Sequence, residues 1–228
     1  MIITIDGPSI SGKTSIARML ARHLHFEYLS SGSLFRGLAY ILVHQFGYHE
    51  SQLASPAPAD IRQALRSDNV EYRYSYESGE QLFWQGKDIL PLLADQKIGK
   101  YASIIGTNQE VRNALAQLQH AIAHDKDIVT DGRDAGSVIF PQAEVKFFLT
   151  ASLHARAARW QANQNEIGRE IDIEQALQEI SERDERDTNR SIAPLRIPEG
   201  AFIIDSSTLT KEQVLGKIVQ EINKKGGK

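Results

Sequence analysis

The chain has 228 residues, of which 41% are apolar and 24% are charged, a mixture typical of a globular protein rather than a disordered one. Its 26 basic and 29 acidic residues leave a formal net charge of −3, which argues against a protein whose whole surface binds nucleic acid. The absence of cysteine excludes disulfides, thiolate metal sites and a cysteine nucleophile, and no apolar run is long enough to span a membrane, so we expect a soluble cytoplasmic protein without a membrane partner.

The N-terminal part of the chain alternates between short apolar runs and helical patterns. A β-branched run over residues 2–5 predicts a buried strand that ends at a glycine turn. Apolar residues at helical spacing predict helices over residues 14–26 and 34–46. Two prolines mark residues 51–60 as a connection, and residues 61–67 predict one more short helix.

Residues 60–93 have a different character, and we interpret them as a small inserted subdomain. Tyrosines at period two, Tyr72, Tyr74 and Tyr76, predict a strand, and a turn over residues 77–80 followed by Trp84 and its neighbours completes a β-hairpin. These aromatic residues would suit a platform for stacking bases. We favour packing inside the subdomain, because no arginine-rich strand face accompanies them.

The C-terminal half returns to alternating strands and helices. The predicted strands cover residues 127–130, 145–149 and 201–205, and the predicted helices cover residues 109–124, 155–162, 173–190 and 209–222. This alternation predicts an α/β fold with a parallel sheet flanked by helices on both faces. Thr210 and Gln213 fit a capping box. His120 and His124 have a spacing that metal ligands use, but no third ligand is evident, so we interpret them as solvated helix residues.

A glycine-rich segment after the first predicted strand carries the clearest chemical signal. It matches G-x-x-x-x-G-K-[ST] and lies between a strand and a helix, the context in which backbone N–H groups and a helix N-terminus surround a phosphate. The guanine-binding motif of GTPases does not occur in the sequence. The motif therefore predicts a nucleoside triphosphate site formed by Gly7, Pro8, Ser9, Ile10, Ser11, Gly12, Lys13, Thr14 and Ser15.

Two charged segments lie at predicted strand and helix ends. After the second strand of the sheet, Asp131 is suited to orient water on Mg²⁺ and Arg133 to bind a phosphate, although an ordinary Asp-Gly turn is the alternative. Further on, Arg183, Asp187 and Arg190 share one face of a predicted helix. That pattern is also compatible with a solvated helix held by weak ion pairs.

Taken in order along the chain, these motifs resemble the bacterial cytidylate kinases of the nucleoside monophosphate kinase superfamily. The matching segments run nearly end to end: residues 5–9 with Gly12-Lys13, residues 31–36, Ser103 followed by Val111-Arg112, residues 132–134 leading to 138–141, and residues 183–190 with 193–195. The resemblance implies one P-loop kinase domain over residues 1–228, with residues 60–93 in the monophosphate-binding subdomain and residues 155–170 as a helical lid.

The resemblance also implies an activity and a division of roles. The protein would be a monomeric enzyme that uses ATP and Mg²⁺ to phosphorylate CMP and dCMP to CDP and dCDP, a reaction of pyrimidine nucleotide metabolism. Lys13, Arg133, Arg156 and Arg159 would be catalytic, and Thr14, Ser15 and Asp131 would serve the metal. The substrate would contact Ser31, Arg112, Asp134 and Arg190 through cytosine, Ser103, Arg183 and Asp187 through the sugar, and Arg36 and Arg133 through the phosphate.

Three residues depart from the family pattern. Ile10 stands where the family usually has glycine, Thr14 where it has a second glycine, and Trp160 where it often has a lid arginine. A β-branched residue resists positive φ, so Ile10 puts the loop conformation in question. Two alternatives therefore stay open: a P-loop kinase for another acceptor such as UMP, and a nucleotide-binding module without turnover.

Overall fold

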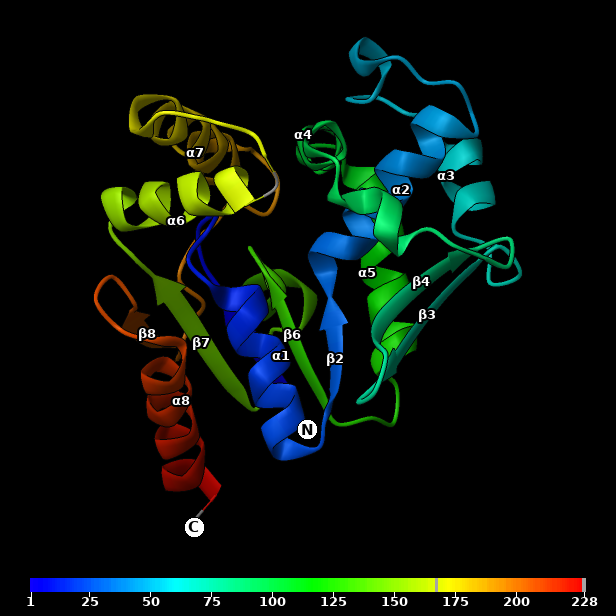
Figure 1. Cartoon of the computed structure of the whole chain (residues 1–228). Helices are drawn as coiled ribbons and strands as arrows, with labels where there is room; N and C mark the ends of the chain where they lie inside the picture. Colours follow the sequence, from blue (N-terminus) through cyan, green and yellow to red (C-terminus); the bar gives the residue numbers. More distant parts are fainter. Residues whose placement is uncertain (167, 227–228) are drawn as a thin grey trace. The chain divides into compact units, whose positions relative to one another are not determined.

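The computed structural model describes residues 1–166 and 168–226 (Figure 1). The strands are β1 Ile2–Asp6, β2 Glu27–Ser30, β3 Val70–Ser75, β4 Gly79–Trp84, β5 Lys87–Asp88, β6 Ile128–Gly132, β7 Val145–Thr150 and β8 Phe202–Asp205. The helices are α1 Lys13–Leu24, α2 Ser31–His44, α3 Pro58–Ala64, α4 Gln96–Ile105, α5 Gln109–Ala123, α6 Leu153–Glu166, α7 Ile173–Asn189 and α8 Lys211–Gly226. Short 3-10 turns cover Glu50–Gln52 and Leu90–Ala94, and a π-helical turn covers Ala135–Ile139.

The strands form two sheets, and the larger one confirms the predicted α/β class. It has five strands in the order β2-β6-β1-β7-β8, and β7 pairs in parallel with both β1 and β8. The smaller sheet, β3-β4-β5, is antiparallel and contains the predicted hairpin. Several predicted boundaries differ from the structure by a few residues. Strand β6 includes Asp131 and Gly132 as its last residues, α6 extends to Glu166, and α3 begins and ends earlier than the predicted range 61–67. Helix α7 ends at Asn189, so Arg190 is its C-cap residue with extended backbone and not a helical residue as predicted.

Strand β2 and helix α4 were not predicted, and neither were the two-residue β5 and the short 3-10 and π-helical turns. Strand β2 has only four residues, too few for a period-two pattern to stand out, and it lies beside the start of β6, where Glu27 N donates to Asp127 O at 2.9 Å. Helix α4 follows the hairpin region, and the Asp95 carboxylate caps it by accepting from Lys97 N at 2.8 Å.

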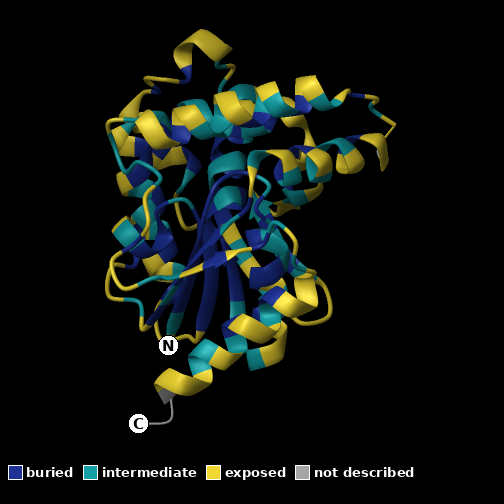
Figure 2. Ribbon diagram, turned by 90° about the vertical axis from the view of Figure 1, so that its left-hand side faces the viewer, coloured by how far each residue is buried: buried dark blue, intermediate teal, exposed yellow. Residues whose placement is uncertain are grey.

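Contacts divide the chain into two compact units, residues 1–26 with 129–228 and residues 27–128. In the first unit, β1, β6 and β7 are almost entirely buried, as expected for parallel strands with helices on both faces (Figure 2). Helix α1 packs against α8, and α6 packs against α7. The predicted capping box of α8 is confirmed, because Thr210 and Gln213 exchange backbone-to-side-chain hydrogen bonds of 2.9 and 3.2 Å.

The second unit is built around α2, which contacts α3, α4 and the hairpin. The apolar positions that predicted this helix, Leu34, Leu38, Ile41 and Leu42, are all buried. Residues 60–93 lie inside this unit, which is wider than the predicted insertion. Within residues 1–166 and 168–226, no helix combines the length and the hydrophobicity needed to cross a membrane.

Asp6, the last residue of β1, is a buried carboxylate with two backbone donors. Its oxygens accept from Ala135 N at 2.8 Å and Gly136 N at 2.7 Å. Burial raises the pKa of Asp6 to about 6, against the opposing effects of the two N–H groups and Lys13. The carboxyl group thus connects the end of β1 to the turn that follows β6. Burying its charged form costs free energy, and this cost grows as the pH rises and the group loses its proton.

The substitution Asp6→Asn tests the free-energy cost of the buried charge, because it removes the ionisable group and with it the dependence of the unfolding free energy on this pKa. The native carboxyl, with a pKa of about 6 against a usual value near ~4, binds a proton more readily than the unfolded one. Its contribution to stability is therefore full below about pH 4 and declines as the pH rises through about 6, by up to about 3 kcal/mol. In urea unfolding, the stability advantage of wild type over D6N should shrink from pH 4 to pH 7. If the difference in unfolding free energy between wild type and D6N does not change with pH, the pKa of Asp6 is not raised in the folded protein.

Asp68→Asn is the control of opposite sign. A hydrogen bond from Arg66 lowers the pKa of this exposed carboxyl, so its contribution is present above its usual pKa and is lost as the pH falls. The advantage of wild type over D68N should accordingly not shrink as the pH rises.

Candidate active site

The phosphate-binding loop connects β1 to α1 and depends on close backbone approach. At Gly7, a Cβ atom would lie 2.0 Å from the carbonyl oxygen of Leu149 in β7, so only glycine fits there. Gly12 has a φ of +92° and begins α1 as its N-cap. The first N–H groups of α1 have no carbonyl partner within the helix, and together with the helix dipole they favour an anion at this end.

Lys13 begins α1 and is almost completely buried. Its Nζ donates to Pro8 O at 2.9 Å, so the side chain folds back over its own loop. Burial and the guanidinium groups of Arg133 and Arg183 lower the pKa of Lys13 well below its usual value, while Asp131 and Asp187 oppose this shift. A phosphate placed in the loop would favour the charged form of the lysine.

Thr14 and Asp131, two of the residues predicted to serve a metal, lie next to each other in the structure. The Thr14 hydroxyl donates to Asp131 Oδ2 at 2.7 Å, and Asp131 is buried at the end of β6. Ser15 follows in the first turn of α1. A hydroxyl and a carboxylate are hard oxygen ligands, which suit Mg²⁺, an ion that takes one or two carboxylates and completes its shell with water and phosphate oxygens. In the described part of the chain, no cluster of three or more acidic, histidine or cysteine residues forms a separate metal site.

Ile10 adopts the left-handed conformation that its side chain disfavours, with a φ of +56°. Its side chain packs against an apolar cluster of α6, α7 and their connection, which contains Ala157, Ile171, Ala176 and Ile180. Trp160 packs against the same cluster. The two residues that depart most from the family pattern therefore share one apolar environment, which offsets the strain at Ile10.

Helix α6 carries both predicted lid arginines. Arg156 is buried, and it donates from Nε to Ala151 O at 3.0 Å and from Nη1 to Ser9 O at 3.1 Å. Arg159 donates to Ser206 after β8, from Nη1 to Oγ at 3.2 Å and from Nη2 to the carbonyl at 2.5 Å. The Ser206 hydroxyl in turn lies 3.1 Å from Ser11 O of the phosphate-binding loop. Both arginines are thus held beside that loop.

Asp184 of α7 is a site residue that the sequence did not predict. Its Oδ1 accepts from Ser9 N at 3.0 Å and from the Ser9 hydroxyl at 2.7 Å, and its Oδ2 pairs with Arg156. The carboxylate therefore links Arg156 to the phosphate-binding loop. The sequence pattern selected Arg183, Asp187 and Arg190 on one helix face, and Asp184 does not belong to that spacing.

The predicted acceptor residues of the first unit form an alternating chain of charges. Arg133 Nε donates to Asp187 Oδ2 at 2.7 Å, Asp187 Oδ1 lies 3.9 Å from Arg190 Nη1, and Arg190 Nη2 donates to Asp134 Oδ1 at 3.3 Å. Burial opposes the charge on Asp187, but Arg133, Arg183 and Arg190 outweigh it and lower the pKa of this carboxyl. The sequence-predicted residues Arg133, Asp134, Arg183, Asp187 and Arg190 thus share one electrostatic network.

The predicted acceptor residues of the second unit lie on three helices. Ser31 and Arg36 are in the first turns of α2, Ser103 is in α4 and Arg112 is in α5. Arg112 donates to Gly106 O at 3.0 Å and its guanidinium lies 5.4 Å from the centre of the Phe35 ring. Helix α2 contacts both α4 and α5. The roles of these four residues stay predictions.

The comparisons with known proteins agree along the whole chain. The family model "Cytidylate kinase" matches residues 3–224. A cytidylate kinase of Thermodesulfovibrio yellowstonii is 35% identical over 221 residues, 97% of each chain, and one of Azotobacter vinelandii is 38% identical over 223 residues, 97% of this chain and 95% of the relative. The crystal structure of an uncharacterized protein from Eubacterium ventriosum has a TM-score of 0.54 and 14% identity over 98% of both chains, which shows a shared fold alone.

Replacing Ile10 by glycine and by alanine separates strain from packing. Both variants lose the contacts of Ile10 with the apolar cluster, but alanine keeps the penalty of positive φ, about 1–2 kcal/mol, and glycine does not. After the larger chain entropy of glycine is subtracted, we expect I10G to be more stable than I10A by about 0.5–1 kcal/mol in urea unfolding.

Ala162→Gly provides the control in an ordinary helical position. Ala162 is an exposed residue of α6, where glycine should be less stable than alanine by about 1 kcal/mol. If I10A is as stable as I10G, the left-handed strain at this position is absent.

Proposed function

This chain belongs to the cytidylate kinase family, and we propose that it transfers the γ-phosphoryl group of ATP to CMP and dCMP, forming CDP and dCDP. The observation that carries the proposal is a buried charge network of Arg133, Asp187, Arg190 and Asp134 close enough to the phosphate-binding loop that Arg133 and Asp187 act electrostatically on Lys13. The loop accounts for a nucleoside triphosphate, and the network supplies donors and acceptors for a second, polar ligand.

On the donor side, we propose that residues 7–15 hold the phosphates of ATP. Their backbone N–H groups and the N-terminus of α1 face the anion, and Lys13 leaves Pro8 O to contact the transferring phosphoryl group. Thr14 and Asp131, with Ser15 as the alternative hydroxyl, would hold Mg²⁺ directly or through water. Mg²⁺ would neutralise phosphate charge when bound.

Catalysis by these residues would consist of positioning and charge neutralisation. Phosphoryl transfer has little covalent chemistry for the protein to perform, so a general base is not required. Arg156 and Arg159 would stabilise the charge that develops on the transferred group, and Asp184 would keep Arg156 aligned with the loop. Closure of the helices around residues 155–170 would exclude water, which competes with CMP for the phosphoryl group.

On the acceptor side, the residue types match the edge of cytosine. The Asp134 carboxylate would accept from the N4 amino group, while Arg190 would donate to the O2 and N3 acceptors. Uracil has a carbonyl in place of the N4 amino group and an N–H in place of the N3 acceptor, which would leave buried polar groups of the protein unpaired. Ser31 and Arg112 would complete base recognition. For the remaining contacts, we propose Ser103, Arg183 and Asp187 at the sugar and Arg36 and Arg133 at the phosphate.

Several finer statements remain proposals that rest on the resemblance. They are the Mg²⁺ requirement, a monomeric state, a cytoplasmic location, the absence of a nucleic-acid partner, and the division of residues 1–228 into one kinase domain with residues 60–93 in the monophosphate-binding subdomain and residues 155–170 as the lid. Within that lid, Ile167 lies outside the described residues. A module without turnover is not favoured, because Ile10 and Trp160, its only support, pack in a common apolar cluster.

An acceptor panel tests the proposed activity. With ATP and Mg²⁺, ADP release should be fast with CMP and dCMP and slower by about 100-fold or more with UMP, AMP or no acceptor. Lys13→Met should lower kcat by about 100-fold or more, because it removes the positive charge that would stabilise the phosphoryl group in the transition state. The exposed Lys224→Met should leave the rate unchanged.

The outcomes separate the alternatives. A preference for UMP would keep the phosphate-binding loop and overturn the assignment of the base-reading residues. ATP binding by the folded protein without turnover would favour the binding module. An unchanged rate in K13M would overturn the role of the loop itself.

A further inference from the structure

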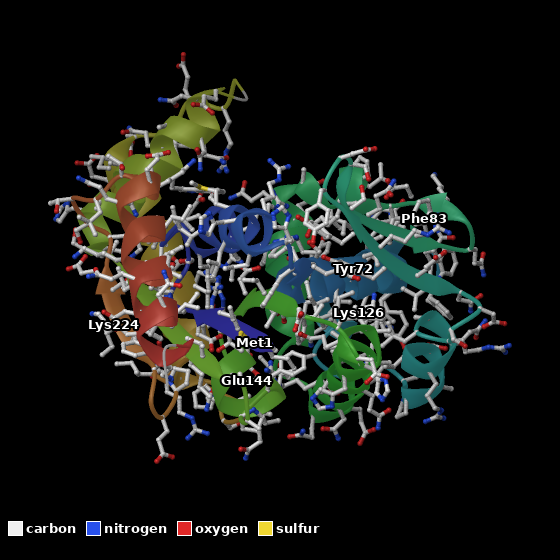
Figure 3. The ribbon with its side chains drawn as sticks, turned by 90° about the horizontal axis from the view of Figure 1, so that it is seen from below. Met1, Tyr72, Phe83, Lys126, Glu144 and Lys224 are labelled. Atoms are coloured by element: carbon white, nitrogen blue, oxygen red, sulfur yellow. The ribbon has the colours of Figure 1, made fainter. Side chains whose placement is uncertain are left out.

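The hairpin of the second unit has one face turned toward the core of that unit. In the register of β3 and β4, Tyr72 lies opposite Leu82 and Tyr74 opposite Glu80. Leu82 and Glu80 are buried, whereas Glu71 and Arg73 on the alternate face of β3 are exposed. Figure 3 shows Tyr72 on the side of the hairpin near β2 and α2, with Phe83 farther from them.

The Tyr72 hydroxyl contacts the end of β2 through the backbone. It donates to Tyr28 O at 2.9 Å and accepts from Ser30 N at 3.1 Å. It therefore bridges a carbonyl and an N–H two residues apart, immediately before Ser31, the first residue of α2. The same hydroxyl lies 3.3 Å from Glu80 Oε2, across the hairpin.

Glu80 extends this contact to the first turn of α2. Only 8% of the residue is exposed, and its Oε1 accepts from the Ser33 hydroxyl at 3.2 Å. Ser33 Oγ lies 3.0 Å from Ser30 Oγ, which also caps the helix by accepting from Ser33 N at 3.2 Å. Arg36 Nη2 donates to Ser33 Oγ at 3.4 Å. A continuous set of polar contacts thus runs from the hairpin to the guanidinium of Arg36.

A close approach of backbone and side chain seats the hairpin on the same helix. A Cβ atom at Gly37 would lie 2.5 Å from Leu82 Cδ2, so any larger residue there would displace the Leu82 side chain, and glycine lets the two elements pack without that shift. Gly37 follows Arg36 directly. The apolar contact and the polar contacts therefore meet at the helical turns that carry Ser31 and Arg36.

We propose that Tyr72 and Glu80 are positioning residues for the acceptor: they hold the first turns of α2 so that Ser31 and Arg36 meet the nucleoside monophosphate in the correct geometry. The inference rests on the proposed function, because Ser31 and Arg36 matter only if this unit binds an acceptor. It gives the inserted hairpin a role in substrate affinity, exerted through α2 rather than by direct contact with the base.

Tyr72→Phe and its neighbour Tyr74→Phe form a matched pair. Each removes one hydroxyl from the same face of β3, but the Tyr74 hydroxyl is buried without a hydrogen-bond partner among the described residues. We expect Y72F to raise the KM for CMP about tenfold, while kcat and the KM for ATP stay within about twofold. Y74F should leave all three constants within about twofold of wild type.

Glu80→Ala and Glu80→Gln add a test by conservative rescue. Alanine removes the acceptor for Ser33, whereas glutamine retains a carbonyl oxygen that can occupy the position of Oε1. We expect E80A to raise the KM for CMP about tenfold and E80Q to restore most of the affinity. Thermal unfolding of each variant identifies any that fail to fold, and the remaining pair then decides the question.

The wild-type acceptor panel separates failure of this inference from failure of the proposed function. If wild type prefers another monophosphate, CMP phosphorylation is wrong, and the same variants are compared with that acceptor. Equal effects of Y72F and Y74F, a parallel rise in the KM for ATP, or E80Q no better than E80A would overturn the positioning role. A rise confined to the acceptor would support it.

Discussion

One buried carboxylate holds together the part of the first unit on which the proposed chemistry depends. Asp6 ends β1 and leads directly into the phosphate-binding loop, and its oxygens accept from Ala135 N and Gly136 N just beyond the Asp131–Asp134 segment. Because β1 and β6 belong to one sheet, these two bonds set the loop that binds ATP in fixed register with Asp131, Arg133 and Asp134. In the first unit, the loop and the charged residues after β6 are therefore joined through the same carboxylate.

The buried ion pairs near Asp6 orient side chains more than they stabilise the fold. Buried ion pairs often contribute little net free energy, because removing the ions from water offsets their attraction. Arg133, Asp187 and Arg190 nevertheless form such a chain, and Asp184 holds Arg156 against Ser9 in the same manner. Each carboxylate fixes a guanidinium that would otherwise sample many rotamers. A polar ligand entering the network meets donors and acceptors that are already oriented.

The sequence predicts what depends on local spacing, and it misses what depends on distant partners. The phosphate-binding loop, the capping box at Thr210 and the helical spacing of Arg183 and Asp187 follow from residues a few positions apart, whereas Arg190 lies just beyond the end of α7. Asp184 contacts Ser9 across 175 residues, Asp6 contacts Ala135 across 129, and Tyr72 contacts Tyr28 across 44, so no local pattern predicts these contacts. Ile10 was correctly singled out, but the apolar cluster that accommodates it became visible only in the fold.

The most direct test of the account is the affinity of Arg190→Met for CMP, measured by titration calorimetry beside that for a non-hydrolysable ATP analogue. Arg190 is nearly buried and contacts Asp134, so its loss should weaken CMP binding by about 10- to 100-fold and leave the analogue within about twofold. Arg186→Met, at an exposed position of α7, should change neither affinity. An unchanged affinity for CMP, or an equal loss for the ATP analogue, would contradict the claim that this charge network reads the acceptor base.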